Sequence, residues 1–389
     1  MLKYEGLVSD RVRGVRPSGI RRFFDIVSEM DDVISLGVGE PDFTTPWHIR
    51  NAGIYSLEKG RTWYTSNDGL AELRQEIARY LHRRFMLTYD PSDEVIVTVG
   101  GSEAIDIGIR ALVGPGDEVI IPQPSFVCYE PLTQLAGGTP VLLPTRREEG
   151  FRLRPEALRA AITPHTKLLV LPFPNNPTGA VLSREELEGI AEVLEGTDIF
   201  VLADEIYAEL TYGETTHVSF PTVGNMRERT ILVGGFSKSY AMTGWRLGYA
   251  CAPAPLAGYM HKIHQFAVMC APTASQYAAV EALRNGDPDI AKMVEEYNMR
   301  RRFMVRELQT MGLECMDPRG AFYVFPSIEK TGLTSEEFCE RLLRQQKVAV
   351  IPGTAFGACG EGHVRISYSY SLKHITQALE RIDTFLRAL

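Results

Sequence analysis

The sequence of 389 residues has no long hydrophobic run and no excess of positive charge, and each absence excludes a class of protein. No stretch approaches the roughly 18 apolar residues of a membrane span, and Met1 to Glu5 contain no apolar core of a signal peptide. The formal net charge of -8 argues against a general affinity for nucleic acid or anionic membranes. We therefore expect a soluble cytoplasmic protein whose partners are small molecules, without nucleic acid or membrane among them.

Two kinds of ligand motif are also missing. The cysteines form no Cys-x-x-Cys pair and no cluster with histidine at metal-ligand spacing, so we predict reduced thiols and no metal site. No helical pattern follows Gly37 and Gly39, so these glycines do not form the Gly-x-Gly-x-x-Gly turn of a dinucleotide site. This disfavours a nicotinamide-dependent dehydrogenase, the alternative from a different class of enzyme.

From about residue 94, short apolar runs alternate with amphipathic stretches, which is typical of a parallel sheet covered by helices on both faces. Predicted helices between the runs include 155–162 and 183–194, and the second starts with a capping box from Ser183 to Glu186. The predicted strands are 94–99, 118–122, 140–143, 167–171, 199–203, 230–233 and 247–251.

The pattern changes near Asp287, where a long charged helix over 290–311 precedes a strand-like run over 320–325 and a final helix over 372–386. A chain of this length fits two domains.

We therefore predict an α/β protein. Its large domain, 45–286, contains a mostly parallel seven-stranded sheet covered by helices, and a smaller α+β domain occupies 287–389. The N-terminal segment, 1–44, is expected to join the small domain.

A lysine among small residues is the most informative feature of the sequence. The apolar run 231–233 leads into a loop that contains Ser237 and Lys238, and Arg246 follows eight positions after the lysine. An amine at the end of a buried strand is costly to leave charged, so it tends toward the neutral nucleophile that condenses with carbonyl groups. An arginine offers a planar fork for a phosphate. Together they predict a site for pyridoxal 5'-phosphate (PLP), although a Ser-Lys pair alone is usually part of a surface loop.

Polar groups follow other predicted strands at the same edge, where ligands bind in open parallel sheets. Gly101, Ser102 and Glu103 open a helix whose free N–H groups suit an anion. Asp204 directly follows a buried strand and needs a cation, which a protonated pyridine nitrogen supplies. A tight turn and a carboxylate bonded to backbone N–H groups remain the ordinary explanations of these features.

Phe126, Asn176 and Tyr207 also lie at strand ends. Taken singly, Phe126 is explained as a core residue and Asn176 as part of a rigid turn. Taken together with Lys238, Asp204 and the anion site at the start of the helix, they match the functional groups of PLP one for one.

The sequence resembles the PLP-dependent aminotransferases of fold type I, class I/II, in the branch of the bacterial and archaeal aspartate and aromatic amino acid aminotransferases. The resemblance extends from residue 18 to residue 368, and its most specific part is the run SKSYAMTGWRLG from Ser237 to Gly248. It implies the PLP transferase fold type I and a homodimer.

The resemblance also assigns roles. Lys238 would carry PLP and, once displaced by substrate, shuttle a proton, while Asp204 would pair with the pyridinium nitrogen. Tyr207 and Asn176 would bind the phenolate oxygen of the ring, and Phe126 would stack on it.

For the phosphate, the resemblance implies Gly101, Ser102, Arg246 and a loop hydroxyl. Many relatives have a serine three residues before the lysine, where this chain has Gly235, and whether Ser237 replaces that serine stays open.

For the substrate, the resemblance implies that Gly39, Asn176 and Arg365 receive the α-carboxylate, Arg365 through two parallel bonds. Tyr64 matches a tyrosine that reaches the cofactor of the neighbouring subunit, so the active sites would be shared. A surface residue remains the alternative for Tyr64.

We therefore expect an aminotransferase that moves the amino group of an aromatic or aspartate-like L-amino acid to a 2-oxo acid such as 2-oxoglutarate, by a ping-pong route through pyridoxamine phosphate. A carbon–sulfur β-lyase and an aminocyclopropane-carboxylate-type lyase stay open, because the same cofactor serves all three. A non-catalytic protein is disfavoured because Lys238, Asp204 and Arg365 are all present.

No residue identifies itself as the one that recognises the substrate side chain. The candidates in the N-terminal segment are Arg11, Arg13, Arg16, Arg21 and Arg22.

Overall fold

The computed structural model describes residues 4–17, 19, 30 and 32–389, so that Arg21 and Arg22 lie outside the described residues. Its central feature is a seven-stranded sheet with the order β2-β8-β7-β6-β5-β3-β4. β7, β6, β5, β3 and β4 run parallel, whereas β8 is antiparallel to both of its neighbours. The strands are β2 (Val95–Thr98), β3 (Glu118–Gln123), β4 (Thr139–Pro144), β5 (Thr166–Leu171), β6 (Phe200–Asp204), β7 (Thr230–Gly235) and β8 (Gly248–Cys251). The seven predicted strands and the mostly parallel sheet are thereby confirmed.

Both faces of this sheet are covered, because successive side chains of a strand enter different cores. In β2, Ile96 packs with α5, α6 and α9, whereas Val95 and Val97 pack on the opposite face with α3, α4 and α10. Beside them on that opposite face, β5 and β6 pack against α7 and α8. The helices are α3 (Trp47–Glu58), α4 (Ala71–Phe85), α5 (Gly100–Leu112), α6 (Tyr129–Ala136), α7 (Pro155–Ala161), α8 (Arg184–Leu194), α9 (Ala254–Ala267) and α10 (Thr273–Asn285). Ser183 caps α8 through the predicted capping box.

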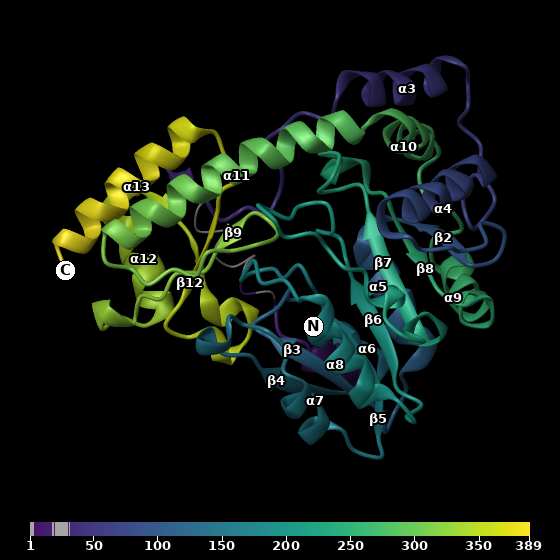
Figure 1. The fold of residues 1–389 in the computed structure, drawn as a ribbon, viewed down its shortest axis with the longest axis horizontal. Helices are drawn as coiled ribbons and strands as arrows, with labels where there is room; N and C mark the ends of the chain where they lie inside the picture. Colours follow the sequence, from purple (N-terminus) through teal and green to yellow (C-terminus); the bar gives the residue numbers. More distant parts are fainter. Residues whose placement is uncertain (1–3, 18, 20–29, 31) are drawn as a thin grey trace.

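The long helix α11 (Asp287–Thr310) leads from α10 to a smaller α/β region at the opposite side of the molecule (Figure 1). That region contains a three-stranded antiparallel sheet in the order β11-β12-β9 and the helices α12 and α13. β1, in the N-terminal segment, pairs in parallel with β10 of the same region. The elements are α1 (Asp10–Gly14), β1 (Ile34–Ser35), β9 (Tyr323–Val324), α12 (Ser335–Gln346), β10 (Val348–Ala349), β11 (Ile351–Pro352), β12 (Val364–Ser367) and α13 (Leu372–Arg387).

The strand expected over 320–325 is shorter than predicted. Only Tyr323 and Val324 form β9. Gly320 forms an isolated antiparallel β-bridge with Thr211, which lies after β6, and Ala321 adopts a left-handed φ of 56°, so the chain turns before β9 begins. The sequence pattern indicated apolar residues correctly but not the local turn.

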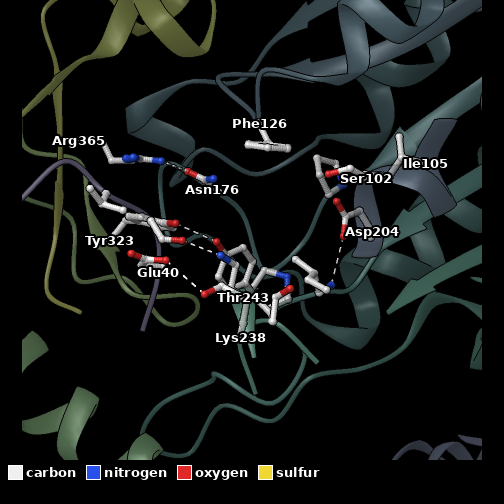
Figure 2. Close-up of a pocket in the computed structure, with 18 of the residues that line it drawn as sticks. Glu40, Ser102, Ile105, Phe126, Asn176, Asp204, Lys238, Thr243, Tyr323 and Arg365 are labelled. Atoms are coloured by element: carbon white, nitrogen blue, oxygen red, sulfur yellow. Dashed lines mark hydrogen bonds between the residues drawn. The ribbon is translucent and has the colours of Figure 1, made fainter. Parts of the chain in front are cut away.

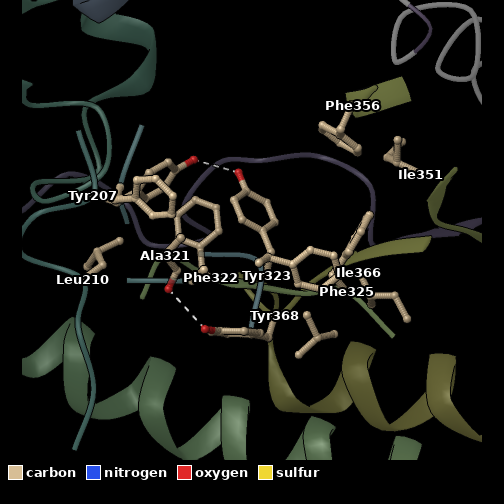
Figure 3. Packing of buried hydrophobic residues seen from close by; sticks show 14 of the residues in the cluster. Tyr207, Leu210, Ala321, Phe322, Tyr323, Phe325, Ile351, Phe356, Ile366 and Tyr368 are labelled. Carbon is tan, nitrogen blue, oxygen red and sulfur yellow. Dashed lines mark hydrogen bonds between the residues drawn. The ribbon is translucent and has the colours of Figure 1, made fainter. Parts of the chain in front are cut away.

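An aromatic cluster joins the two regions (Figure 3). Tyr207, which follows β6, packs edge-on against Phe322 and Tyr323, with ring centroids 5.4 Å and 6.0 Å away. Tyr368 donates a hydrogen bond to the carbonyl of Ala321. These contacts bring β9 and β12 against the carboxyl ends of the large sheet.

Among the residues described, no helix is both long and apolar enough to span a membrane. The same residues contain no group of three or more His, Cys, Asp or Glu side chains placed to hold a metal ion. All six cysteines are free.

Candidate active site

A cavity of about 340 Å³ lies where the large sheet's carboxyl ends meet β9 and β12 (Figure 2). This volume is within the range of about 300 to 1,000 Å³ that is usual for small-molecule sites. The predicted site residues that line it are Gly39, Gly101, Ser102, Phe126, Asn176, Asp204, Tyr207, Ser237, Lys238, Arg246 and Arg365. Glu103, Tyr64 and the arginines Arg11, Arg13 and Arg16 are not among the lining residues.

Lys238 lies in the loop that follows β7, with its amine in the cavity. Its Nζ donates a hydrogen bond of 2.6 Å to the carbonyl of Gly39 and stands 5.9 Å from the ring centroid of Tyr207. The pKa of Lys238 is lowered from 10.5 to about 8. Burial is the largest cause and the positive charge of Arg365 is the second, whereas the Glu40 carboxylate raises the pKa. The amine is therefore available in its neutral, nucleophilic form at mildly alkaline pH.

Asp204 ends β6 at the other side of the cavity. Its Oδ2 accepts a hydrogen bond of 2.7 Å from the hydroxyl of Tyr129, and its Oδ1 accepts one of 3.2 Å from the backbone N–H of Ile206. Burial raises the pKa of Asp204, while these two donors and the Lys238 charge favour the carboxylate. A cation in the cavity would stabilise that carboxylate further. Tyr129 was not predicted, although its place three residues after Phe126 was a signal that could have been followed.

Arg365, on β12, is a buried cation without an acidic partner among the described residues. Nη1 donates to Oδ1 of Asn176 at 2.8 Å, and Nη2 donates to the carbonyl of Gly37 at 2.6 Å. Its guanidinium lies between the rings of Tyr323 and Phe356, 4.4 and 4.7 Å from their centroids. Nε has no hydrogen-bond partner. Neutral acceptors and ring faces leave the charge uncompensated, so the side chain is prepared to bind an anion.

Asn176 and a pair of tyrosines complete this side of the cavity. Because Oδ1 of Asn176 accepts from Arg365, its Nδ2 is left to donate to a group in the cavity. The hydroxyls of Tyr207 and Tyr323 are 2.8 Å apart. A Cβ atom on residue 39 would collide with the hydroxyl of Tyr323, which explains glycine at that position. Tyr323 and Glu40 also line the cavity and were not predicted, because their contacts join segments far apart in the sequence.

The N-terminus of α5 and Arg246 lie next to each other and together could hold a second anion. Gly100 has a φ of 75°, and a Cβ atom there would lie 2.7 Å from Nη2 of Arg246, so only glycine lets the guanidinium approach the helix. The N-terminal N–H groups of a helix and an arginine without an acidic partner among the described residues are suited to a phosphate. Ser102 and Ser237 also line the cavity.

The glycine at position 235 has a steric cause. A Cβ atom on Gly235 would come within 2.8 Å of Cδ1 of Ile206 and 3.2 Å of Cα of Gly248. A serine therefore does not fit without displacement of β8 or Ile206. Ser237, two residues on, faces the cavity instead.

Glu103, which was predicted to bind the cofactor, points away from the cavity. Its carboxylate accepts from the backbone N–H of Val99 and from His264, behind the N-terminus of α5 and away from the cavity. Its side chain therefore does not line the cavity, a direction that proximity to glycines could not show, and its assignment to cofactor binding stays a prediction. Tyr64 is 76% exposed on the surface, so its predicted role in a neighbouring subunit stays a prediction.

The residues present fit PLP. The cavity combines an amine with lowered pKa, a buried carboxylate, an aromatic ring from Phe126 and the anion site beside Arg246. These are the groups needed for the aldehyde, the ring nitrogen, the ring face and the phosphate. Arg365 lines the same cavity and is left for a second anion.

Comparison with known proteins agrees with this chemistry. The family model described as aminotransferase class I and II matches residues 31–382. A Bacillus subtilis protein, YugH, whose name says aminotransferase, is 54% identical over 379 residues, which are 97% of this chain and 98% of that protein. An aspartate aminotransferase of Pyrococcus abyssi is 45% identical over 382 residues, 98% of each chain. The solved structure of the aromatic aminotransferase from Pyrococcus horikoshii OT3 has a TM-score of 0.90 at 43% identity, covering 94% of this chain and 99% of that one.

The lowered pKa of Lys238 predicts how the apoprotein captures PLP. Because the neutral amine attacks the aldehyde, the second-order rate of capture should rise with pH through about 8 and then level off. Stopped-flow absorbance measures that rate, and a simple alkylamine measured in parallel corrects for the titration of PLP itself. A midpoint near the ordinary lysine value of 10.5 would contradict the assigned environment.

Proposed function

Because this chain belongs to the class I and II aminotransferases, a PLP-dependent family of transferases, we propose that its substrates are an aromatic or aspartate-like L-amino acid and a 2-oxo acid such as 2-oxoglutarate. Its fold is the PLP transferase fold type I. The names of its relatives, which include aspartate and aromatic aminotransferases, support this substrate range. They do not favour the carbon–sulfur β-lyase or the aminocyclopropane-carboxylate-type lyase.

One observation carries the proposal: two anion sites and an amine share one cavity. Arg365 is 2% exposed and has no acidic partner in the described part of the chain, which makes it the receptor for the substrate α-carboxylate. The Arg246 site takes the cofactor phosphate. An amino acid held by Arg365 would then have its α-carbon beside the amine of Lys238, as the shared lining of the cavity allows.

When bound, PLP supplies the carbonyl that receives the amino group and a ring that delocalises the electrons left on the α-carbon. Nζ of Lys238 takes the proton from that carbon and returns a proton to complete the transfer. Asp204, fixed by Tyr129 and Ile206, keeps the proton on the ring nitrogen. The hydroxyl of Tyr207 and the Nδ2 of Asn176 would hold the ring oxygen, and Phe126 would cover one face of the ring.

A homodimer with shared active sites belongs to the same proposal. Trp63 and Tyr64 are 62% and 76% exposed, and Phe266, at the end of α9, is 87% exposed. The carbonyl of Trp63 accepts a hydrogen bond from Thr273, and Asn67 donates one to the carbonyl of Met269 just beyond α9. A second subunit covering this surface would bury its aromatic side chains and bring Tyr64 to the cofactor of the partner.

The domain division and the location in the cell are also proposals. Pairing of β1 with β10 supports the assignment of segment 1–44 to the small domain, 287–389, beside the large domain, 45–286. Six free cysteines are consistent with the reducing cytoplasm.

A panel of amino donors with 2-oxoglutarate tests the substrate range, and Arg365→Lys tests its basis. Aromatic amino acids or aspartate should be the best donors. Because the α-carboxylate is common to all donors and lysine lacks the planar fork, Arg365→Lys should raise KM for every amino and oxo acid by a similar factor, on the order of tenfold or more. A change confined to one substrate would instead make Arg365 a reader of the side chain.

Subunit mixing tests the shared site. A Lys238→Ala chain and a Tyr64→Ala chain should form hybrid dimers in which one site carries both substitutions and the other is intact. An equal mixture with full exchange should therefore recover about a quarter of the wild-type activity, well above either parent. If Tyr64 acts within its own chain, no hybrid site is intact, and the mixture gives only the average of the parents after verified exchange.

A further inference from the structure

A histidine and a glutamate meet directly behind the N-terminus of α5, outside the cavity. The side chain of His264, on α9, is fully buried. Its Nδ1 lies 2.7 Å from Oε1 of Glu103, and its Nε2 lies 2.8 Å from the backbone carbonyl oxygen of Asn67. The other carboxylate oxygen of Glu103 accepts the N–H of Val99, the residue before α5 begins. Three segments that are far apart in the sequence thus meet at one ion pair.

The chemistry of the partners fixes the charge of His264. A carboxylate and a backbone carbonyl can only accept hydrogen bonds, so both ring nitrogens must donate and the ring is an imidazolium. The N–H of Val99 and the positive end of the helix dipole both stabilise a carboxylate at this place. Burial lowers the pKa of His264, but the bonds to Glu103 and Asn67 and the charge of Asp68 outweigh it and raise the pKa overall.

The pair has a distinct place among the contacts of residues 64–69, here called the Tyr64 loop. Two other bonds, from Asn67 to the carbonyl of Met269 and between Asp68 and His261, connect this loop to α9 and its C-terminal end. A third bond, from the N–H of Val97 on β2 to the carbonyl of Asp68, connects the loop to the strand before α5. None of these three bonds involves a residue of α5. The His264–Glu103 pair therefore connects the Tyr64 loop and α9 to the first turn of α5.

We propose that Glu103 and His264 are positioning residues that fix the phosphate-binding first turn of α5 relative to the Tyr64 loop. The inference rests on the proposed phosphate site at Gly101, Ser102 and Arg246. By fixing the N–H of Val99, Glu103 sets the direction in which the following turn presents its own N–H groups. By holding the carbonyl of Asn67, His264 sets the position of the loop that carries Tyr64.

The ion pair also accounts for a carboxylate so close to an anion site. A lone Glu103 would repel a phosphate at the same helix end. The imidazolium of His264 neutralises that charge, so the pair positions the helix without opposing the anion. The charge facing this pair from neighbouring segments comes from Asp68 of the loop, with His261 one helical turn away on α9.

The experiment measures binding to the apoprotein and not activity. Dissociation constants are determined for PLP and for pyridoxal, which lacks the phosphate. Glu103→Ala removes both contacts and should weaken PLP binding about tenfold or more while pyridoxal binding hardly changes. Glu103→Gln should restore most of the affinity, because the amide can accept from Val99 and donate to a neutral His264. Amide hydrogen exchange in residues 64–69 should be faster in Glu103→Ala than in the wild type.

Two controls make the outcomes distinguishable. Asp106→Ala, on the same helix, removes only an exposed ion pair to Arg110 and should leave both affinities and the exchange unchanged. Arg246→Gln tests the phosphate site itself. If Arg246→Gln loses PLP affinity and Glu103→Ala does not, the positioning inference is wrong and the site stands. If Arg246→Gln also keeps the affinity, the proposed site is wrong.

A general loss of structure is separated in the same way. An equal loss of PLP and pyridoxal binding in Glu103→Ala would reduce the pair to a contribution to stability and overturn the inference. If Glu103→Ala does not fold, His264→Leu breaks the same connection with a side chain of similar size. It must then show the selective loss of PLP binding and the faster exchange, and wild-type behaviour would refute the proposal.

Discussion

Positive charge without an acidic partner in one cavity is the constraint on which the rest of the site depends. Arg365 and Arg246 have no acidic partner in the part of the chain that the structure describes, and both face the same space as Lys238. The charge of Arg365, which is 2% exposed, is costly unless an anion binds it, whereas Arg246 is exposed at the rim of the same cavity. Both charges also help burial to lower the pKa of Lys238 to about 8. The groups that bind a phosphate and a carboxylate therefore also activate the amine that reacts with the carbonyl.

The fold makes this arrangement by bringing two regions together. The large sheet contributes Asp204 at the end of β6 and Lys238 just beyond β7, while β12 of the smaller region contributes Arg365. The aromatic contacts of Tyr207 with Phe322 and Tyr323 hold the two regions against each other at the cavity. Binding and chemistry therefore both depend on the packing between regions, since neither one contains the complete site.

The location of the site at the strand ends was predictable from the sequence. Buried parallel strands are continuous apolar runs, and the residues that follow them lie at one edge of the sheet. That reasoning found Lys238 and Asp204 from local sequence alone. It did not show the direction of the Glu103 side chain, because that direction on the first turn of a helix depends on what packs behind it. It also missed Tyr129 and Tyr323, whose hydroxyls meet Asp204 and Tyr207 only in the folded chain. The resemblance to a family supplied Arg365, but its two carbonyl partners and its lack of a carboxylate needed the structure.

The most direct test of the account is the identity of the residue that carries the cofactor. The protein loaded with PLP is reduced with borohydride, digested and analysed by mass spectrometry. The account predicts a phosphopyridoxyl group on Lys238, with none on the Lys238→Ala protein. Modification of a different lysine in the wild type, or unchanged modification after Lys238→Ala, would contradict it.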